Sequence, residues 1–146
     1  MKRIFIPIVA ALAFCAVPRV AHAQDEWVRQ VRNLLSEAGK RFEQEGYELT
    51  HQIYTGSLNN ASSEDVQVTL EIGKEYQLMG ACDTDCSDLD FTLYDSNGNQ
   101  IDQDILEDDF PIVSVTPRRS GSFRVHVSMA ACSAEPCRYG IGIFGK

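Results

Sequence analysis

After Gly46 the apolar residues of this chain recur at every second position, and this period is the strongest constraint on its fold. Tyr47, Leu49 and Ile53 alternate with polar residues, and the segment 66–72 repeats the pattern. Such alternation is typical of strands that bury one face. Further candidate strands occupy residues 76–81, 89–94, 99–103, 112–116, 123–129 and 139–144.

Turn-forming residues separate these candidate strands at short intervals. Gly73-Lys74, Asn97-Gly98 and the segment 117–121 have the composition of tight turns, and Asn-Gly is a strong hairpin signal. Seven or eight short strands joined in this way predict an all-β fold, an antiparallel β-sandwich or jelly roll over residues 47–146. No internal repeat or further domain is indicated.

The segment before Gly46 has a different period. Between residues 25 and 45 the apolar positions are separated by steps of three and four, which predicts an amphipathic helix. These positions are Trp27, Val31, Leu34, Leu35, Ala38 and Phe42. Asp25 is a candidate N-cap and Gly46 a candidate stop, so we assign the helix to residues 24–46. We expect its apolar stripe to pack on the sandwich; the alternative is that the stripe binds a partner.

Residues 1–23 have the composition of a secretory signal peptide. Lys2 and Arg3 precede an apolar run over 4–17, and Ala21-His22-Ala23 places small residues where a signal peptidase cuts. The apolar run is too short to span a bilayer. We therefore expect a bacterial protein that is exported to the periplasm or secreted, with no stable membrane insertion after cleavage.

The chain is acidic, with 21 Asp and Glu against 13 Lys and Arg and a formal net charge of −8. Cleavage after Ala23 removes Lys2, Arg3 and Arg19 and no acidic residue, so the mature chain is more acidic still. Such a charge repels nucleic acid and anionic membranes, and it suits solubility, divalent cations or basic partners. Nucleic-acid binding is therefore excluded from the expected functions.

Four cysteines remain after the predicted cleavage, since Cys15 lies in the signal segment; they are Cys82, Cys86, Cys132 and Cys137. An even number of cysteines in an exported chain predicts two disulfides. Zinc is the alternative, but Cys-x3-Cys with Cys-x4-Cys is irregular spacing for a zinc module, and an oxidising compartment works against it. Of the three connectivities we favour local pairing, because each pair brackets a short loop.

The order of the strands predicts which loops lie together. If consecutive strands alternate in direction, the connections 59–65, 82–88, 104–110 and 130–137 collect at one end of the sandwich. That end would hold both cysteine pairs and most of the loop carboxylates. The opposite end would hold the tight turns with Lys74, Arg118 and Arg119.

Three aspartates on the 82–88 loop are candidate calcium ligands: Asp83, Asp85 and Asp88. Calcium takes several oxygen ligands, and a short loop braced by a disulfide brings carboxylates near one another. The segment 104–110 would contribute further aspartates at the same end. The alternative is that these carboxylates are solvated and serve solubility.

Little in the sequence indicates catalysis. The mature chain has two histidines, His51 and His126, and each lies in a candidate strand. Neither has a serine in a nucleophile-elbow setting, and disulfide pairing leaves no free thiol as a nucleophile. Metalloprotease and phosphate-loop motifs are absent from the sequence. We therefore expect no enzymatic activity.

Five segments of the chain occur in a familiar order: "GSL" at 56–58, "VQVTLEIGKEYQL" at 66–78, "SDLDFTLYDSNGNQI" at 87–101, "PIVSVTPRRSGSFRVHV" at 111–127 and "YGIGIF" at 139–144. Together they resemble the bacterial pre-peptidase C-terminal (PPC) domain, a secreted β-sandwich related to collagen-binding domains of bacterial collagenases. The resemblance implies a non-catalytic accessory domain, and some relatives bind calcium. We expect this chain to differ from the family in carrying the sandwich without a peptidase, in its preceding helix and in its two cysteine pairs.

These observations predict an exported, non-catalytic binding module. We expect it to recognise a protein or a glycan through its acidic, disulfide-braced loops, with calcium as a candidate stabilising ion. The alternative is a periplasmic inhibitor or stress protein that acts on a basic hydrolase, because a small acidic domain complements a basic enzyme.

Overall fold

A computed structural model describes residues 20–146 of the chain, with side chains from Glu26 onward. One helix, α1 (Val20–Gln44), precedes nine strands in this part of the chain. The strands are β1 (Glu48–Leu49), β2 (Tyr54–Leu58), β3 (Ser62–Leu70), β4 (Tyr76–Cys82), β5 (Cys86–Tyr94), β6 (Gln100–Asp104), β7 (Ile112–Val115), β8 (Gly121–Cys132) and β9 (Cys137–Gly145).

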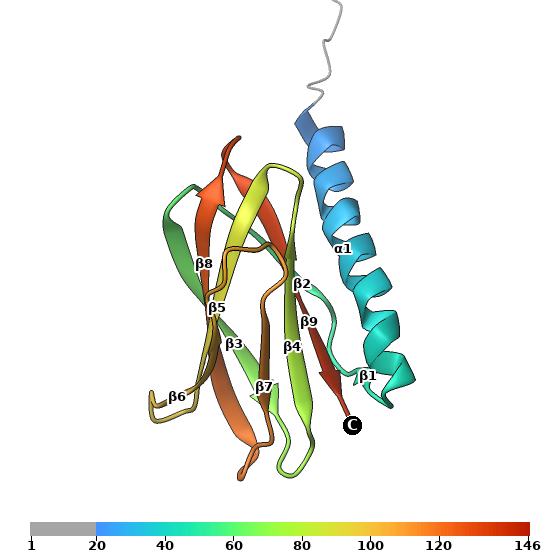
Figure 1. The fold of residues 1–146 in the computed structure, drawn as a ribbon, viewed down its shortest axis with the longest axis vertical. Helices are drawn as coiled ribbons and strands as arrows, with labels where there is room; N and C mark the ends of the chain where they lie inside the picture. The colour runs from blue at the N-terminus through green and yellow to red at the C-terminus, as the bar shows by residue number, and fades with distance from the viewer. Residues whose placement is uncertain (1–19) are drawn as a thin grey trace, which may run out of the picture.

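The strands form two antiparallel sheets that pack face to face (Figure 1). One sheet has the order β1-β9-β4-β7, and β2 pairs with β9 as well. The other sheet has the order β3-β8-β5-β6. The predicted fold class, an antiparallel β-sandwich with one N-terminal helix, is confirmed.

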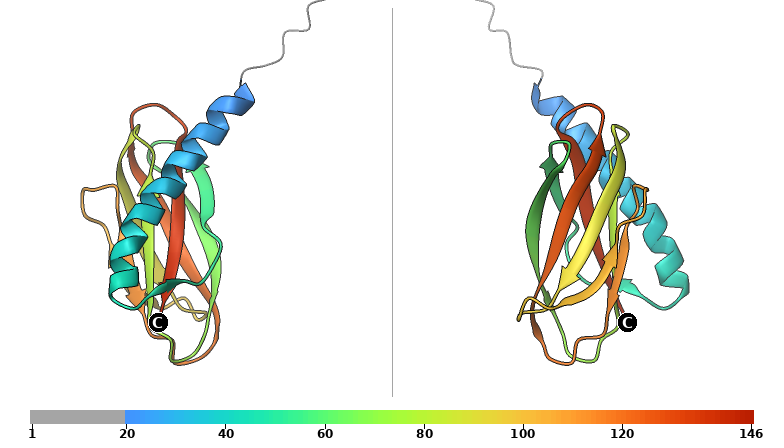
Figure 2. Two further views of the ribbon diagram at one scale, coloured as in Figure 1. Left: turned by 90° about the vertical axis from the view of Figure 1, so that its right-hand side faces the viewer. Right: turned by 60° about the vertical axis from the view of Figure 1, so that its left-hand side comes forward.

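Period-two alternation builds the core between the sheets. Val66, Val68 and Leu70 of β3 are buried, and β8 and β5 alternate in the same way. The outer face of this sheet is polar, and it is largely exposed on β3 and partly exposed on β5 and β8, as is usual for an antiparallel sheet covered on one side. In contrast, β4 and β9 are buried on both faces, because α1 covers the outer face of their sheet (Figure 2).

Helix α1 has its own small core with this sheet. Val31 and Leu35 are fully buried against Met79, Ala81 and Phe144, with further apolar residues around them. The packing predicted for the apolar stripe is thus confirmed for all of its residues except Trp27. The helix begins at Val20, so Asp25 lies within it and is not its N-cap. Alanines and a glutamine stand before Asp25, and these good helix formers let the helix extend upstream.

Gly140 of β9 permits the close approach of α1, and Gly142 makes room for the ring of Phe144 on the same strand. A Cβ atom at Gly140 would lie 2.7 Å from Val31 Cγ1 and 3.0 Å from Leu35 Cδ1. A Cβ atom at Gly142 would lie 2.8 Å from the ring of Phe144. Since real Cβ atoms do not come this near to other carbons, a larger residue at Gly140 would press on the helix, whereas one at Gly142 would press on the ring of Phe144.

The predicted signal segment falls largely on residues 1–19, which lie outside the described residues; its last residues, 20–23, form the first turn of α1. Within residues 20–146, no helix combines the length and the apolar character needed to cross a bilayer.

Candidate functional site

Four connections gather at one end of the sandwich, which we call the braced end: residues 59–61, 83–85, 105–111 and 133–136. All strand pairs are antiparallel, so these connections join strand ends on the same side. The connections 71–75 and 116–120, with Lys74, Arg118 and Arg119, lie at the other end (Figure 1). The arrangement predicted from strand order is confirmed.

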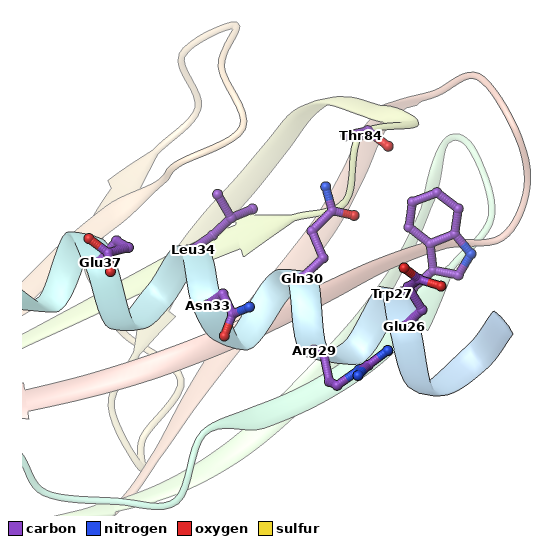
Figure 3. A pocket seen from close by; sticks show the side chains of 8 residues that line it. All are labelled: Glu26, Trp27, Arg29, Gln30, Asn33, Leu34, Glu37 and Thr84. Atoms are coloured by element: carbon purple, nitrogen blue, oxygen red, sulfur yellow. The ribbon is translucent and has the colours of Figure 1, made fainter. Parts of the chain in front are cut away.

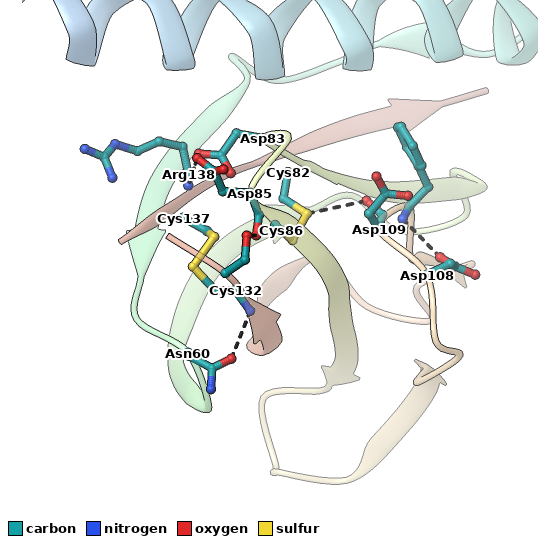
Figure 4. Close-up of a disulfide and its surroundings, with 12 residues drawn as sticks. Asn60, Cys82, Asp83, Asp85, Cys86, Asp108, Asp109, Cys132, Cys137 and Arg138 are labelled. Carbon is teal, nitrogen blue, oxygen red and sulfur yellow. Dashed lines mark hydrogen bonds between the residues drawn. A yellow bond between two sulfur atoms is a disulfide. The ribbon is translucent and has the colours of Figure 1, made fainter. Parts of the chain in front are cut away.

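Both disulfides lie at the braced end and pair locally (Figure 4). Cys82 bonds Cys86 and Cys132 bonds Cys137, and the Cα atoms are 5.9 Å apart in each pair. The two bridges are neighbours, because Cys86 and Cys132 are partners in the register of β5 and β8. The favoured connectivity is confirmed, and the braces hold the turns 83–85 and 133–136.

Hydrogen bonds join these two turns to each other. The backbone N–H of Ser133 donates to the carbonyl oxygen of Asp85 at 2.8 Å, and its hydroxyl donates to the same oxygen at 2.9 Å. Asn60, on the 59–61 turn, accepts the backbone N–H of Cys132 at 2.9 Å. Three of the four connections therefore form one tied surface with little freedom to rearrange.

Asp83 is buried, although the sequence placed it on an exposed acidic loop. Its side chain is 3% exposed, and Oδ2 accepts the backbone N–H of Arg138 at 2.7 Å. Oδ1 is buried with no hydrogen-bond partner. Burial raises the pKa of the Asp83 carboxyl above its ordinary value, and the hydrogen bonds offset this in part.

The other two candidate calcium ligands have different surroundings. Asp85 is partly exposed beside Ser133. Asp88 lies on β5, with a buried, unpaired Oδ1, and burial followed by the charges of Glu107 and Asp108 raises its pKa. Among the described residues, no three His, Cys, Asp or Glu side chains are grouped as metal ligands. Calcium binding by this triplet therefore stays a prediction without geometric support.

Replacing Asp83 with asparagine is expected to raise the free energy of unfolding at neutral pH by about 1–2 kcal/mol, since the variant buries no charge at the unpaired oxygen. The folded carboxyl has a raised pKa, so the folded protein holds this proton more firmly than the unfolded chain. The wild type should gain stability as pH falls from neutral through the raised pKa, down to the unfolded value near 3.8. Urea unfolding at a series of pH values measures this.

The Asp83→Asn variant should show less of this gain on acidification. Asp95→Asn is a control of opposite sign, because hydrogen bonds from Asn99 lower the pKa of the Asp95 carboxyl. That carboxyl stabilises the fold at neutral pH and ceases to do so as pH falls through its lowered pKa. If the free energy of unfolding of Asp83→Asn depends on pH in the same way as that of the wild type, the buried carboxyl of Asp83 does not cause this dependence.

An open groove of about 750 Å³ lies between the N-terminal half of α1 and the 83–85 turn (Figure 3). The turn contributes Thr84, and the helix contributes Glu26, Trp27, Arg29, Gln30, Asn33, Leu34 and Glu37. Gln30 and Trp27 extend from the helix on the side where Thr84 lies. The sequence placed Trp27 in the packing stripe, but it is only partly buried and lines this groove.

His51 and His126 do not line the groove, and both are held by neighbouring residues. His51 Nδ1 is 2.8 Å from Thr50 Oγ1, and its Nε2 is 2.9 Å from the carbonyl oxygen of Thr69. His126 Nδ1 is 2.7 Å from Asp65 Oδ1 on the exposed outer face of the β3-β8 pair. These contacts fit structural roles for both side chains.

The fold and the braced end define a class: a small antiparallel β-sandwich whose loops are fixed by local disulfides and flanked by a helix. Comparison with known proteins takes the identification no further, since no protein-family model matches the sequence and no curated protein is significantly similar to it. The resemblance to PPC domains therefore stays a prediction. The case for a function rests on the geometry of the groove and the loops.

Proposed function

We propose that this protein is an exported, non-catalytic binding module that takes a glycan or a peptide segment of a protein in the groove between α1 and the 83–85 turn. One observation carries the proposal: the turn braced by Cys82–Cys86 forms a wall of the groove, opposite a helix that is packed firmly on the sheet. Both walls are preorganised, which lowers the entropy lost when a ligand binds.

The chemistry of the groove suits polar ligands with a flat apolar face. The indole of Trp27 offers a large surface for stacking against a sugar ring or an apolar side chain. The amides of Gln30 and Asn33 supply donors and acceptors, and Glu26 and Glu37 add acceptors. A few polar groups beside an aromatic ring are typical of small-ligand sites. The N-terminal signal pattern and the resemblance to accessory domains support export and a non-catalytic role.

The chain contains a single tryptophan, so the fluorescence of Trp27 reports directly on this groove. Titration with oligosaccharides and with short peptides is expected to shift its emission for one of these classes. Replacing Gln30 with alanine should lower the affinity for that ligand about fivefold, because a hydrogen bond contributes roughly 1 kcal/mol net to binding. Gln44→Ala is the matched control, since Gln44 is exposed at the other end of the same helix.

Equal losses in the Gln30 and Gln44 variants, or no response to either ligand class, would contradict the proposal. The same titration carried out with calcium and with a chelator tests the calcium prediction for Asp83, Asp85 and Asp88. If calcium changes neither the affinity nor the melting temperature, that prediction is rejected and the groove proposal stands.

A further inference from the structure

The loop between β6 and β7 exposes large apolar side chains. Ile105, Leu106 and Phe110 of the loop are 58%, 66% and 37% exposed, and Ile112 at the start of β7 is 40% exposed. Single exposed apolar residues are ordinary, but four within eight consecutive positions are a concentrated patch. We call these residues, with Glu107, Asp108 and Asp109 between them, the 105–112 face.

The backbone beneath this face is fixed. The N–H of Leu89 in β5 donates to the carbonyl oxygen of Asp108 at 2.9 Å. The N–H of Gly80 in β4 donates to the carbonyl oxygen of Pro111 at 2.8 Å. Asp108 Oδ1 accepts the N–H of Phe110 at 3.0 Å. The loop thus spans the open side of the sandwich from one sheet to the other. Its apolar side chains are displayed on a pinned frame, so little order would have to be gained on binding.

The charge around the face has one sign. Between Lys74 and Arg118 the sequence contains eleven Asp and Glu and no Lys, Arg or His. This segment forms β4, β5, β6 and β7. The carboxylates crowd one another: besides burial, the charges of Asp88, Asp104 and Asp108 raise the pKa of Asp90. Cations brought by a partner would relieve this repulsion.

The edge of β7 is closed to a further strand. The N–H of Ile112 donates to Asp104 Oδ2 at 2.9 Å, and the N–H of Ser114 donates to Asp102 Oδ2 at 2.8 Å. These aspartates of β6 occupy the donors that an added strand would use. A partner therefore contacts the face through side chains and not by extending the sheet.

We propose that the 105–112 face docks a basic protein segment that carries apolar side chains between its lysines and arginines. The apolar side chains would pack on Ile105, Leu106 and Phe110, and the cations would lie beside Glu107 and Asp109. A second copy of this chain, or an anionic membrane, would bring like charge to the face and be repelled. The inference does not depend on the groove beside α1, which is a separate site.

The test uses a short labelled peptide that alternates lysine and leucine, with fluorescence anisotropy as the readout. The double variant Leu106→Ser with Glu107→Lys is expected to weaken binding about tenfold or more, because it removes an apolar contact and reverses a charge. Ile72→Ser with Glu71→Lys is the matched control at the opposite end of the sandwich. Ile72 is 63% exposed, close to the 66% of Leu106, and both variants change the net charge equally.

The control variant should bind the peptide as the wild type does. A peptide that alternates lysine and serine should bind more weakly, since it keeps the charge and loses the apolar contacts. Three results would overturn the proposal: equal losses in both double variants, equal binding of the lysine–serine peptide, or a wild-type dimer in sedimentation that Leu106→Ser dissociates. The first two indicate unspecific charge attraction, and the third makes a second copy the occupant.

Discussion

Replacing Gly140 with valine is expected to force α1 off the sheet and to lower the free energy of unfolding by about 3 kcal/mol. The Cβ atom of the new side chain would lie 2.7 Å from Val31 Cγ1 and 3.0 Å from the backbone oxygen of Tyr54. The backbone oxygen is fixed by the pairing of β2 with β9, and the side chain of Val31 is β-branched and fully buried, so it has no room to turn aside. The strain therefore falls on the packing between helix and sheet.

Two opposing effects have to be separated, because valine also favours a strand more than glycine does. Gly121→Val measures this gain alone, since a Cβ atom at Gly121 has nothing within 4 Å. We expect Gly121→Val to be neutral or slightly stabilising. Adding Val31→Ala to Gly140→Val should restore part of the lost stability, because the alanine removes the nearest clashing methyl group.

Chemical unfolding of the wild type and the three variants gives these free energies, and Trp27 fluorescence gives the state of the groove. In Gly140→Val the ligand response should be lost while the far-ultraviolet signal of the strands persists. If Gly140→Val were as stable as Gly121→Val, the close packing of helix and sheet inferred from Gly140 would be wrong. If the variant lost stability but kept ligand binding, the groove would not need the docked helix.

The fold was predictable from the sequence because its main signals are local. Alternation in 66–72 and 123–129 identified β3 and β8, and Asn97-Gly98 identified the turn between β5 and β6. Strand β2 was missed because Gly56 and Ser57 interrupt the alternation of Tyr54–Leu58. In the structure the ring of Tyr139 lies over Gly56, 2.7 Å from where a Cβ atom would be. This strand exists because β9 pairs with it, and such a cause is not visible in the segment itself.

The braced end was predictable in outline and not in detail. Antiparallel order fixed which loops meet, and this needed no side-chain information. The burial of Asp83 depends on the backbone of Arg138, which lies far along the chain. The groove depends on where α1 crosses the sheet, so the helical period of Trp27 did not distinguish a core residue from a groove residue. The 105–112 face had a usable signal, since "DILEDDFPI" at 104–112 mixes acidic and apolar residues in a loop.

Removing both disulfides, with all four cysteines replaced by alanine, is expected to lower the free energy of unfolding by about 4 kcal/mol. Each bridge closes a short loop, with a sequence separation of 4 for Cys82–Cys86 and 5 for Cys132–Cys137. The lost restraint on the unfolded chain costs about 2 kcal/mol of stability for each bridge. The free energy of unfolding of a small domain is only about 5–15 kcal/mol. The loss should therefore be plain when the urea unfolding of the disulfide-bonded wild type is compared with that of the variant.

Two further variants each lack one bridge, with one cysteine pair replaced by alanine. They are matched controls for each other, because their expected losses of stability are nearly equal while the bridges they lack lie at different places in the braced end. Cys82–Cys86 holds the turn that carries Thr84, so its removal should also lower the affinity of the groove for its ligand. Cys132–Cys137 lies beside that turn, joined to it by hydrogen bonds of Ser133 to Asp85 and of Arg138 to Asp83, but it does not close the turn, so its removal should lower the affinity for the ligand less. Equal losses of affinity would mean that the braced end acts as one unit; no loss in either variant would mean that the groove does not depend on its braces.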